Sequence, residues 1–172
     1  MRKAWKIIVT IIVVLILACF IVPGLWIGGV LTPSPGVKGI TEIYQNNRDT
    51  LHNITQYLSN SEYDHIYITD TMEDGVMFTG LESGNIAISD FGVTEDIKDI
   101  MGNHKCNVIN KYDNVIVFQV WAAKDKSAGV VYSVDGNTPE VEFLTKIQRL
   151  KDDDWYYYEE DFNKWKLQNK QK

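Results

Sequence analysis

The chain has 172 residues and a formal net charge of −6 at pH 7, from 17 basic and 23 acidic side chains. This acidic balance argues against a nucleic-acid partner, because such binding depends on clustered Lys and Arg side chains. Two cysteines in a chain of this length also exclude a disulfide-rich scaffold.

The N-terminal apolar segment is the most informative feature of the chain. Residues 7–22 are apolar except for one threonine, and the apolar stretch continues past a Pro-Gly pair to residue 31. A helix needs about 20 mainly apolar residues to cross a bilayer core about 30 Å thick. Trp5 and Trp26 bracket the segment and are 21 positions apart. That is about 32 Å of helix, which fits one Trp at each interface. The sequence therefore predicts a transmembrane helix over residues 7–31.

The basic residues around this segment indicate its orientation. Arg2, Lys3 and Lys6 precede it, and the first basic residue after it is Lys38. Loops rich in Lys and Arg stay in the cytoplasm. We therefore expect residues 1–6 to be cytoplasmic and the C-terminal bulk to lie outside the cell membrane, as in a single-pass protein.

Two alternatives to an uncleaved anchor remain open. Residues 16–19 resemble the lipobox of bacterial lipoproteins, in which the cysteine, here Cys19, becomes lipidated. The residues after Cys19 are apolar, however, where a polar tether is usual. The second alternative is a cleaved signal peptide. Such a peptide has a shorter apolar core, of about 7–15 residues, and a clean small-residue cleavage site, and this segment departs from both.

The remainder of the chain is expected to form one exported domain. Residues 32–38 contain two prolines, which favour a short extended linker. Residues 39–172 fit one domain by length. Because three of the 17 basic residues precede the apolar segment, the exported part has 14 basic against 23 acidic side chains, a net charge of −9. Only Cys106 lies in it, which is typical of a bacterial cell envelope without oxidative folding, such as that of a Gram-positive organism.

A helical periodicity opens this domain. Six positions recur at steps of four and three, which places them on one apolar face with a single polar member. We predict that this face packs against a sheet, and a short coiled coil is the alternative. The six positions are Ile40, Tyr44, Asn47, Leu51, Ile54 and Leu58.

Three short alternating segments follow at residues 65–69, 76–79 and 85–89. Turn residues separate them, so we predict a three-stranded antiparallel meander. Thr94 then begins a second helical pattern that ends near Gly102. We predict a short helix capped by the Thr94 hydroxyl.

The C-terminal part has a second series of strand patterns. The segment 115–122 is apolar on both faces, as in a central strand. Asp161 is expected to cap a terminal helix. The order predicts an α+β fold with a mainly antiparallel sheet, one packed helix and short accessory helices. The five predicted strands are residues 106–110, 115–122, 128–135, 143–149 and 155–159.

Metal-binding patterns are weak. His104 and Cys106 are the closest pair of zinc-ligand types, but a structural zinc site needs four ligands, usually in two close pairs. The triplet at 152–154 is Asp-Asp-Asp and lacks the spacing and central Gly of a calcium loop. We interpret the first as a loop histidine beside a buried cysteine and the second as a solvated turn, and we expect no cofactor.

The aromatic run at residues 155–158 is the feature most similar to a binding surface. In a strand, Trp155 and Tyr157 share one face, and Tyr156 and Tyr158 share the other. Exposed rings of Trp155 and Tyr157 beside Glu159 could stack on sugars or hold a basic peptide. Ordinary cross-strand packing is the alternative, because aromatic residues favour half-buried sheet surfaces.

No catalytic constellation can be assembled from the sequence. Residues 80–84 miss the G-x-S-x-G elbow by one place, and the Asp-Phe-Gly triplet at 90–92 lacks every other kinase motif. We therefore expect a non-enzymatic binding or interaction module at the bacterial cell envelope, with a protein, peptide or wall component as its ligand. Two alternatives stay open: an envelope hydrolase with paired carboxylates, and an immunity or inhibitor protein against a basic toxin or enzyme.

Overall fold

The computed structural model describes residues 33–80, 84–103, 106–140, 143–151 and 154–169. The predicted transmembrane helix at 7–31 and the candidate lipidation site Cys19 lie outside these ranges. No helix within them is both long enough and apolar enough to span a bilayer. By its contacts the chain divides into two units, Met1–Pro33 and Ser34–Lys172, and the described residues other than Pro33 belong to the second unit.

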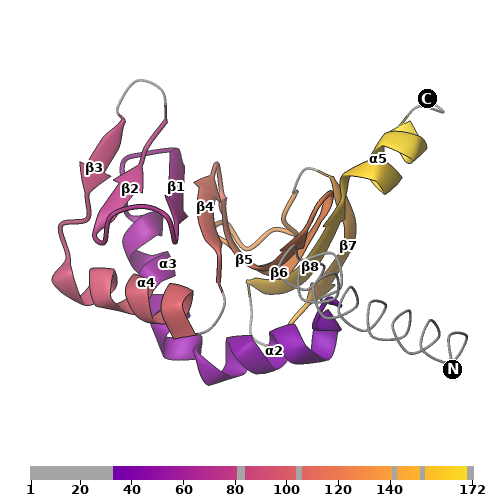
Figure 1. The fold of residues 1–172 in the computed structure, drawn as a ribbon, viewed down its shortest axis with the longest axis horizontal. Coiled ribbons are helices and arrows are strands. Elements are labelled where there is room, and N and C mark those ends of the chain that lie inside the picture. Colours follow the sequence, from indigo (N-terminus) through magenta and orange to yellow (C-terminus); the bar gives the residue numbers. More distant parts are fainter. Residues whose placement is uncertain (1–32, 81–83, 104–105, 141–142, 152–153, 170–172) are drawn as a thin grey trace, which may run out of the picture. The chain divides into compact units, whose positions relative to one another are not determined.

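The second unit is a mixed α+β fold around one antiparallel sheet, as predicted (Figure 1). The sheet order is β3-β2-β1-β4-β5-β6-β8-β7, and every neighbouring pair is antiparallel. The helices are α2 (Gly36–Asn46), α3 (Arg48–Ser59), α4 (Phe91–Asn103) and α5 (Phe162–Asn169). The strands are β1 (His65–Thr69), β2 (Val76–Phe78), β3 (Asn85–Ala87), β4 (Val108–Tyr112), β5 (Val115–Ala123), β6 (Lys126–Ser133), β7 (Leu144–Arg149) and β8 (Trp155–Asp161).

Helix α2, the first within the described residues, begins in the segment that we assigned to the linker. Pro35 occupies the N-cap position of α2, and the Gly36 amide donates a hydrogen bond of 3.2 Å to the Ser34 hydroxyl. Proline is favoured at a helix start because it has no amide hydrogen to leave unpaired. The prolines of this segment therefore lead directly into the folded part.

The predicted apolar helical face is confirmed, but two helices carry it. Its six positions are at most 7 % exposed and belong to one core with the inward residues of the sheet, except for the polar Asn47. Asn47 interrupts the helix with φ −125°, and its side-chain amide donates a hydrogen bond of 2.7 Å to the Ile43 carbonyl. Asparagine competes with backbone hydrogen bonding in this way. Helices α2, α3 and α4 lie along the same face of the sheet (Figure 1).

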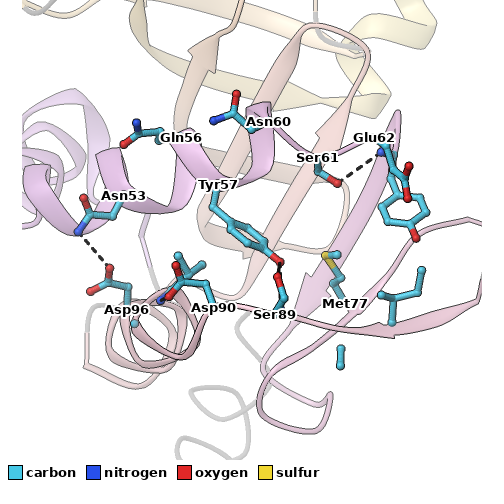
Figure 2. A pocket seen from close by; sticks show the side chains of 15 residues that line it. Asn53, Gln56, Tyr57, Asn60, Ser61, Glu62, Met77, Ser89, Asp90 and Asp96 are labelled. Atoms are coloured by element: carbon cyan, nitrogen blue, oxygen red, sulfur yellow. Dashed lines mark hydrogen bonds between the residues drawn. The ribbon is translucent and has the colours of Figure 1, made fainter.

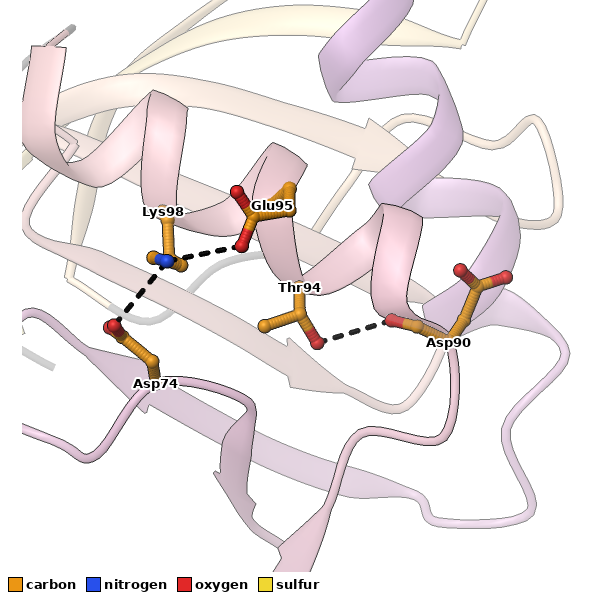
Figure 3. A network of polar contacts seen from close by, with 5 residues as sticks. All are labelled: Asp74, Asp90, Thr94, Glu95 and Lys98. Atoms are coloured by element: carbon orange, nitrogen blue, oxygen red, sulfur yellow. Dashed lines mark hydrogen bonds and ion pairs between the residues drawn. The ribbon is translucent and has the colours of Figure 1, made fainter.

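The cap of α4 is Asp90, so our prediction of Thr94 was wrong. The Val93 amide donates to Asp90 Oδ1 at 3.2 Å, and aspartate is among the strongest N-cap residues. The Thr94 hydroxyl instead donates back to the Asp90 carbonyl at 3.1 Å. Lys98 connects the same helix to the turn before β2, with its ammonium 3.6 Å from Asp74 (Figure 3). These contacts lie where α4 approaches the turn that precedes β2.

Strand β5 is central and apolar on both faces, as predicted. A bulge between Gln119 and Trp121 shifts its register with β6, and bulges bend and twist a sheet. Gly129 of β6 faces the bulge, where an added Cβ would lie 2.0 Å from the Phe118 carbonyl oxygen. The two strands therefore approach too closely for any other residue. On the face opposite the helices a smaller apolar cluster forms from Val115, Val117, Val131, Tyr156 and Tyr158.

The C-terminal elements follow the prediction closely. Strands β7 and β8 pair with each other, and β8 also pairs with β6. The Asp161 carboxylate accepts a hydrogen bond of 2.9 Å from the Lys164 amide, which confirms it as the cap of α5. Phe143 contacts Phe162 and Trp165 edge to face, at centroid distances of 5.1 Å and 4.9 Å. These rings attach α5 to the start of β7.

Candidate functional site

Trp155 and Tyr157, the aromatic residues we singled out, are core residues. Their exposed fractions are 4 % and 0 %, and both belong to the cluster under α2 and α3. The Trp155 ring lies 5.0 Å from that of Tyr44 and 5.9 Å from that of Phe118. The packing alternative therefore describes them, because the helices cover this face of β8. Neither residue offers an open ring face for stacking on a ligand.

Glu159, the third residue of that prediction, is engaged with its neighbours. Its carboxylate accepts a hydrogen bond from the Tyr157 hydroxyl and lies 3.6 Å from the Lys146 ammonium. The same ammonium lies 5.3 Å from the centre of the Tyr157 ring. Burial, assisted by Glu159, raises the pKa of Tyr157 well above its ordinary value, so the phenol keeps its proton. The three groups stabilise the pairing of β7 with β8.

The weak metal-ligand patterns do not come together in the described part. His104, Asp152 and Asp153 lie outside the described residues. Cys106 is 2 % exposed, and burial raises the pKa of its thiol to about 12. Among the described residues, no group of three His, Cys, Asp or Glu side chains is placed to hold a metal ion.

A recess of about 680 Å³ lies between α3, the start of α4 and strands β2 and β3 (Figure 2). We call it the acidic groove. Helix α3 contributes Asn53, Gln56 and Tyr57, and its C-cap residue is Asn60. Their spacing of three, one and three residues places them on one face of the helix, away from its buried positions. Three of the four carry amide groups, each of which can both donate and accept hydrogen bonds.

The charged groups of the acidic groove have one sign. Asp90, Asp96 and Glu62 line it, and none of its lining residues that the structure describes is Lys, Arg or His. Asp96 accepts a hydrogen bond of 3.2 Å from the Asn53 side chain, which connects α4 to α3. The floor is apolar, with Met77 3 % exposed and Val93 7 % exposed.

One contact defines the inner edge of the acidic groove. The Tyr57 hydroxyl lies 3.2 Å from the Ser89 hydroxyl and accepts a hydrogen bond of 3.1 Å from the Ser89 amide. This pair joins α3 to the segment between β3 and α4 (Figure 2). Phe91, the residue after Asp90, is 77 % exposed and is not among the described lining residues of the groove.

This arrangement suits binding better than proton transfer. Asp90 and Asp96 both accept hydrogen bonds from within the fold. Carboxylates held in this way retain further lone pairs for a cation or a hydroxyl group. A volume of about 680 Å³ is within the range of small-ligand and peptide-side-chain sites.

No known protein family, curated protein or solved structure matches this chain. Its function must therefore be inferred from the groove itself.

The sequence analysis did not predict the acidic groove, although one signal was present. The polar series on α3 also falls on one face of the helix, as does the apolar series that we did identify.

Proposed function

We propose that this protein is a binding module of the bacterial cell envelope, anchored by residues 7–31, whose acidic groove takes a basic segment of a protein or peptide. One observation carries the binding part of the proposal. The lining of the groove combines three carboxylates with three side-chain amides, and its described residues include no basic side chain. Complementary charge of this kind steers a basic partner and selects against acidic ones.

The location rests on the amino-acid sequence. Three basic residues precede an apolar segment of spanning length, and the 23 acidic residues all follow it. This distribution supports a cytoplasmic N-terminus and an exported domain. An inhibitor of a basic toxin or enzyme would use the same groove, so it is one form of this proposal.

The binding proposal is tested with the full-length chain in a non-ionic detergent. A lysine-rich peptide is titrated in, and the dissociation constant is measured by calorimetry at low and at raised salt. Asp96→Asn and Glu62→Gln each remove one carboxylate from the groove and keep a hydrogen-bond acceptor. Each should weaken binding about 2–5-fold, as expected for exposed charge pairs.

Glu95→Gln is the matched control. Glu95 lies on the same helix and carries the same charge, but it pairs with Lys98 at 3.0 Å and does not line the groove. Its replacement should leave peptide affinity unchanged. Raised salt should weaken the wild-type interaction markedly. Salt-insensitive binding, or equal losses in the control and in Asp96→Asn, would reject the groove as the site.

The location is tested separately by adding protease to intact cells. The domain should be digested without lysis, whereas protection until lysis would contradict the export of the domain. A Cys19→Ser variant should remain in the membrane fraction. Release of this variant into the medium would favour the lipoprotein alternative.

A further inference from the structure

A second recess of about 390 Å³ lies beside the first turn of α3. We call it the aromatic hollow. It shares no described lining residue with the acidic groove. Its lining residues are Tyr44, Arg48, His52, Tyr132, Lys151, Asp154 and Trp155.

Basic side chains from two distant segments converge on the aromatic hollow. Arg48 and His52 are one turn apart on α3, so they share one face of the helix. Lys151 comes from the segment after β7, about a hundred residues later in the chain. The domain as a whole is strongly acidic, with 23 Asp and Glu residues. The two cationic side chains, Arg48 and Lys151, point to a ligand with negative charge.

The floor of the aromatic hollow is a set of packed rings. Trp155 lies 5.0 Å from the Tyr44 ring and 5.1 Å from the Tyr132 ring. Trp155 and Tyr44 are buried, whereas Tyr132 is partly exposed. Aromatic side chains of this kind provide a rigid surface that combines an apolar face with a polar edge. The partly exposed Tyr132 is the ring of this set that a cyclic ligand can contact.

One carboxylate completes the described lining. Asp154 has φ 68°, a left-handed conformation that aspartate tolerates, and its carboxylate lies 3.8 Å from the Arg149 guanidinium. Its neighbours Asp152 and Asp153 lie outside the described residues. A carboxylate opposes a simple anion, but it is a good acceptor for hydroxyl groups. The ligand should therefore carry hydroxyl groups as well as negative charge.

We propose that the aromatic hollow binds a carboxylate-bearing sugar, with its carboxylate toward Arg48 and Lys151, its ring against Tyr132 and its hydroxyl groups toward Asp154. Four of the seven described lining residues then have a matching group on the ligand. The volume lies in the lower part of the range for small-molecule sites, which is suitable for one or two sugar rings. This site is separate from the acidic groove, and it stands if the groove binds nothing.

Three small probes distinguish this ligand from its relatives. Glucuronate has the ring, the hydroxyl groups and the carboxylate, glucose lacks the carboxylate, and acetate lacks the ring. Each is titrated into the full-length chain while the Trp155 indole signal is followed by NMR. Glucuronate should bind saturably, and glucose and acetate should each bind at least about tenfold more weakly, because each loses one set of contacts. Equal binding of glucuronate and acetate would indicate a bare anion site and overturn the proposal.

Two variants and a control test the residues. Lys151→Gln and Arg48→Gln should each weaken glucuronate binding roughly tenfold and leave glucose binding unchanged. Arg48 has further contacts within the fold, so Lys151→Gln is the cleaner test. Lys38→Gln removes an exposed charge from α2, outside the hollow, and should have no effect. Absence of glucuronate binding to the wild type, or equal losses in Lys38→Gln and Lys151→Gln, would reject the proposal.

Discussion

The acidic groove and the aromatic hollow differ in charge, yet one helix lines both. Arg48 and His52 at the start of α3 face the hollow, whereas Asn53 and Asn60 further along face the groove. A helix has a partial positive charge at its N-terminus and a partial negative charge at its C-terminus. The charge of each recess agrees with the end of α3 that is nearer to it.

The two recesses show that one amphipathic helix can contribute to two surfaces of different charge. The 12 residues of α3 divide between a buried face, which includes Leu51 and Ile54, and one polar face whose two ends line different recesses. The hollow lies on core aromatic rings, while the groove combines exposed amides and carboxylates with an apolar floor. We therefore expect substitutions in the hollow to affect stability and substitutions in the groove to affect mainly affinity.

The largest effect should come from Trp155→Ala. Trp155 packs against Tyr44, Phe118 and Tyr132, so its removal leaves a cavity in the core. The free energy of unfolding should fall by about 3–5 kcal/mol, measured by denaturant unfolding. Asn60→Ala at the rim of the groove should change it by less than about 0.5 kcal/mol. Similar small changes in both variants would contradict the distinction between the two recesses.

The buried core that contains Cys106 should be inaccessible to thiol reagents. Burial raises the pKa of the Cys106 thiol to about 12, so the reactive thiolate is strongly disfavoured in the folded chain at neutral pH. In a Cys19→Ser background, maleimide should label Cys106 only after denaturation. Rapid labelling of the native chain would show that the core opens between the recesses.

Because burial raises the pKa of the Cys106 thiol, we predict that the folded domain loses stability at alkaline pH. Between pH 9.0 and about 12 the unfolded chain releases this proton while the folded chain retains it. The free energy of unfolding should therefore decrease as the pH rises through this window. A Cys106→Ala variant should lack that part of the slope, and an identical slope in the variant would refute the assignment.

A smaller effect should come from Tyr57→Phe in the acidic groove. The variant loses the hydroxyl that accepts a hydrogen bond from the Ser89 amide. The free energy of unfolding should fall by about 1 kcal/mol, and peptide affinity should fall because the inner edge of the groove loosens. Tyr67→Phe, at a tyrosine that is 41 % exposed, is the control and should be neutral.

The smallest effect should come from Lys98→Gln. The Lys98 ammonium makes exposed contacts with Glu95 at 3.0 Å and Asp74 at 3.6 Å, outside both the groove and the hollow. Exposed ion pairs contribute little at physiological salt. The unfolding midpoint and both ligand affinities should be unchanged. A loss of affinity at either recess would show that this network positions α4.

Local patterns predicted much of the fold. The spacing of Ile40 to Leu58 identified the buried helical face, and alternation identified the β1–β3 meander and central strand β5. The helix break at Asn47 was not predicted. The Asn47 side-chain amide donates to the Ile43 carbonyl in place of a backbone amide, so the spacing of apolar residues continues through the break. The cap of α4 was predicted too late, at Thr94, because the apolar positions that indicated the helix begin after it, whereas the observed cap is Asp90.

The recesses were less accessible to sequence reasoning. Trp155 and Tyr157 are buried because α2 and α3 cover that face of β8, which depends on contacts between residues about a hundred positions apart. The aromatic hollow likewise depends on contacts between distant parts of the chain, because it brings Arg48 and Lys151 together. Alternation in a strand specifies two faces, but the packing of distant elements decides which face is covered.

We propose that the two ends of α3 select ligands of opposite charge. NMR of the full-length chain, titrated with a lysine-rich peptide and, separately, with glucuronate, tests whether each ligand uses its own recess. We predict that the peptide shifts the signals of Asn53, Asn60 and Asp96, and that glucuronate shifts those of His52, Tyr132 and Trp155. If both ligands shift the same set of signals, or each shifts the other's set, the claim is wrong.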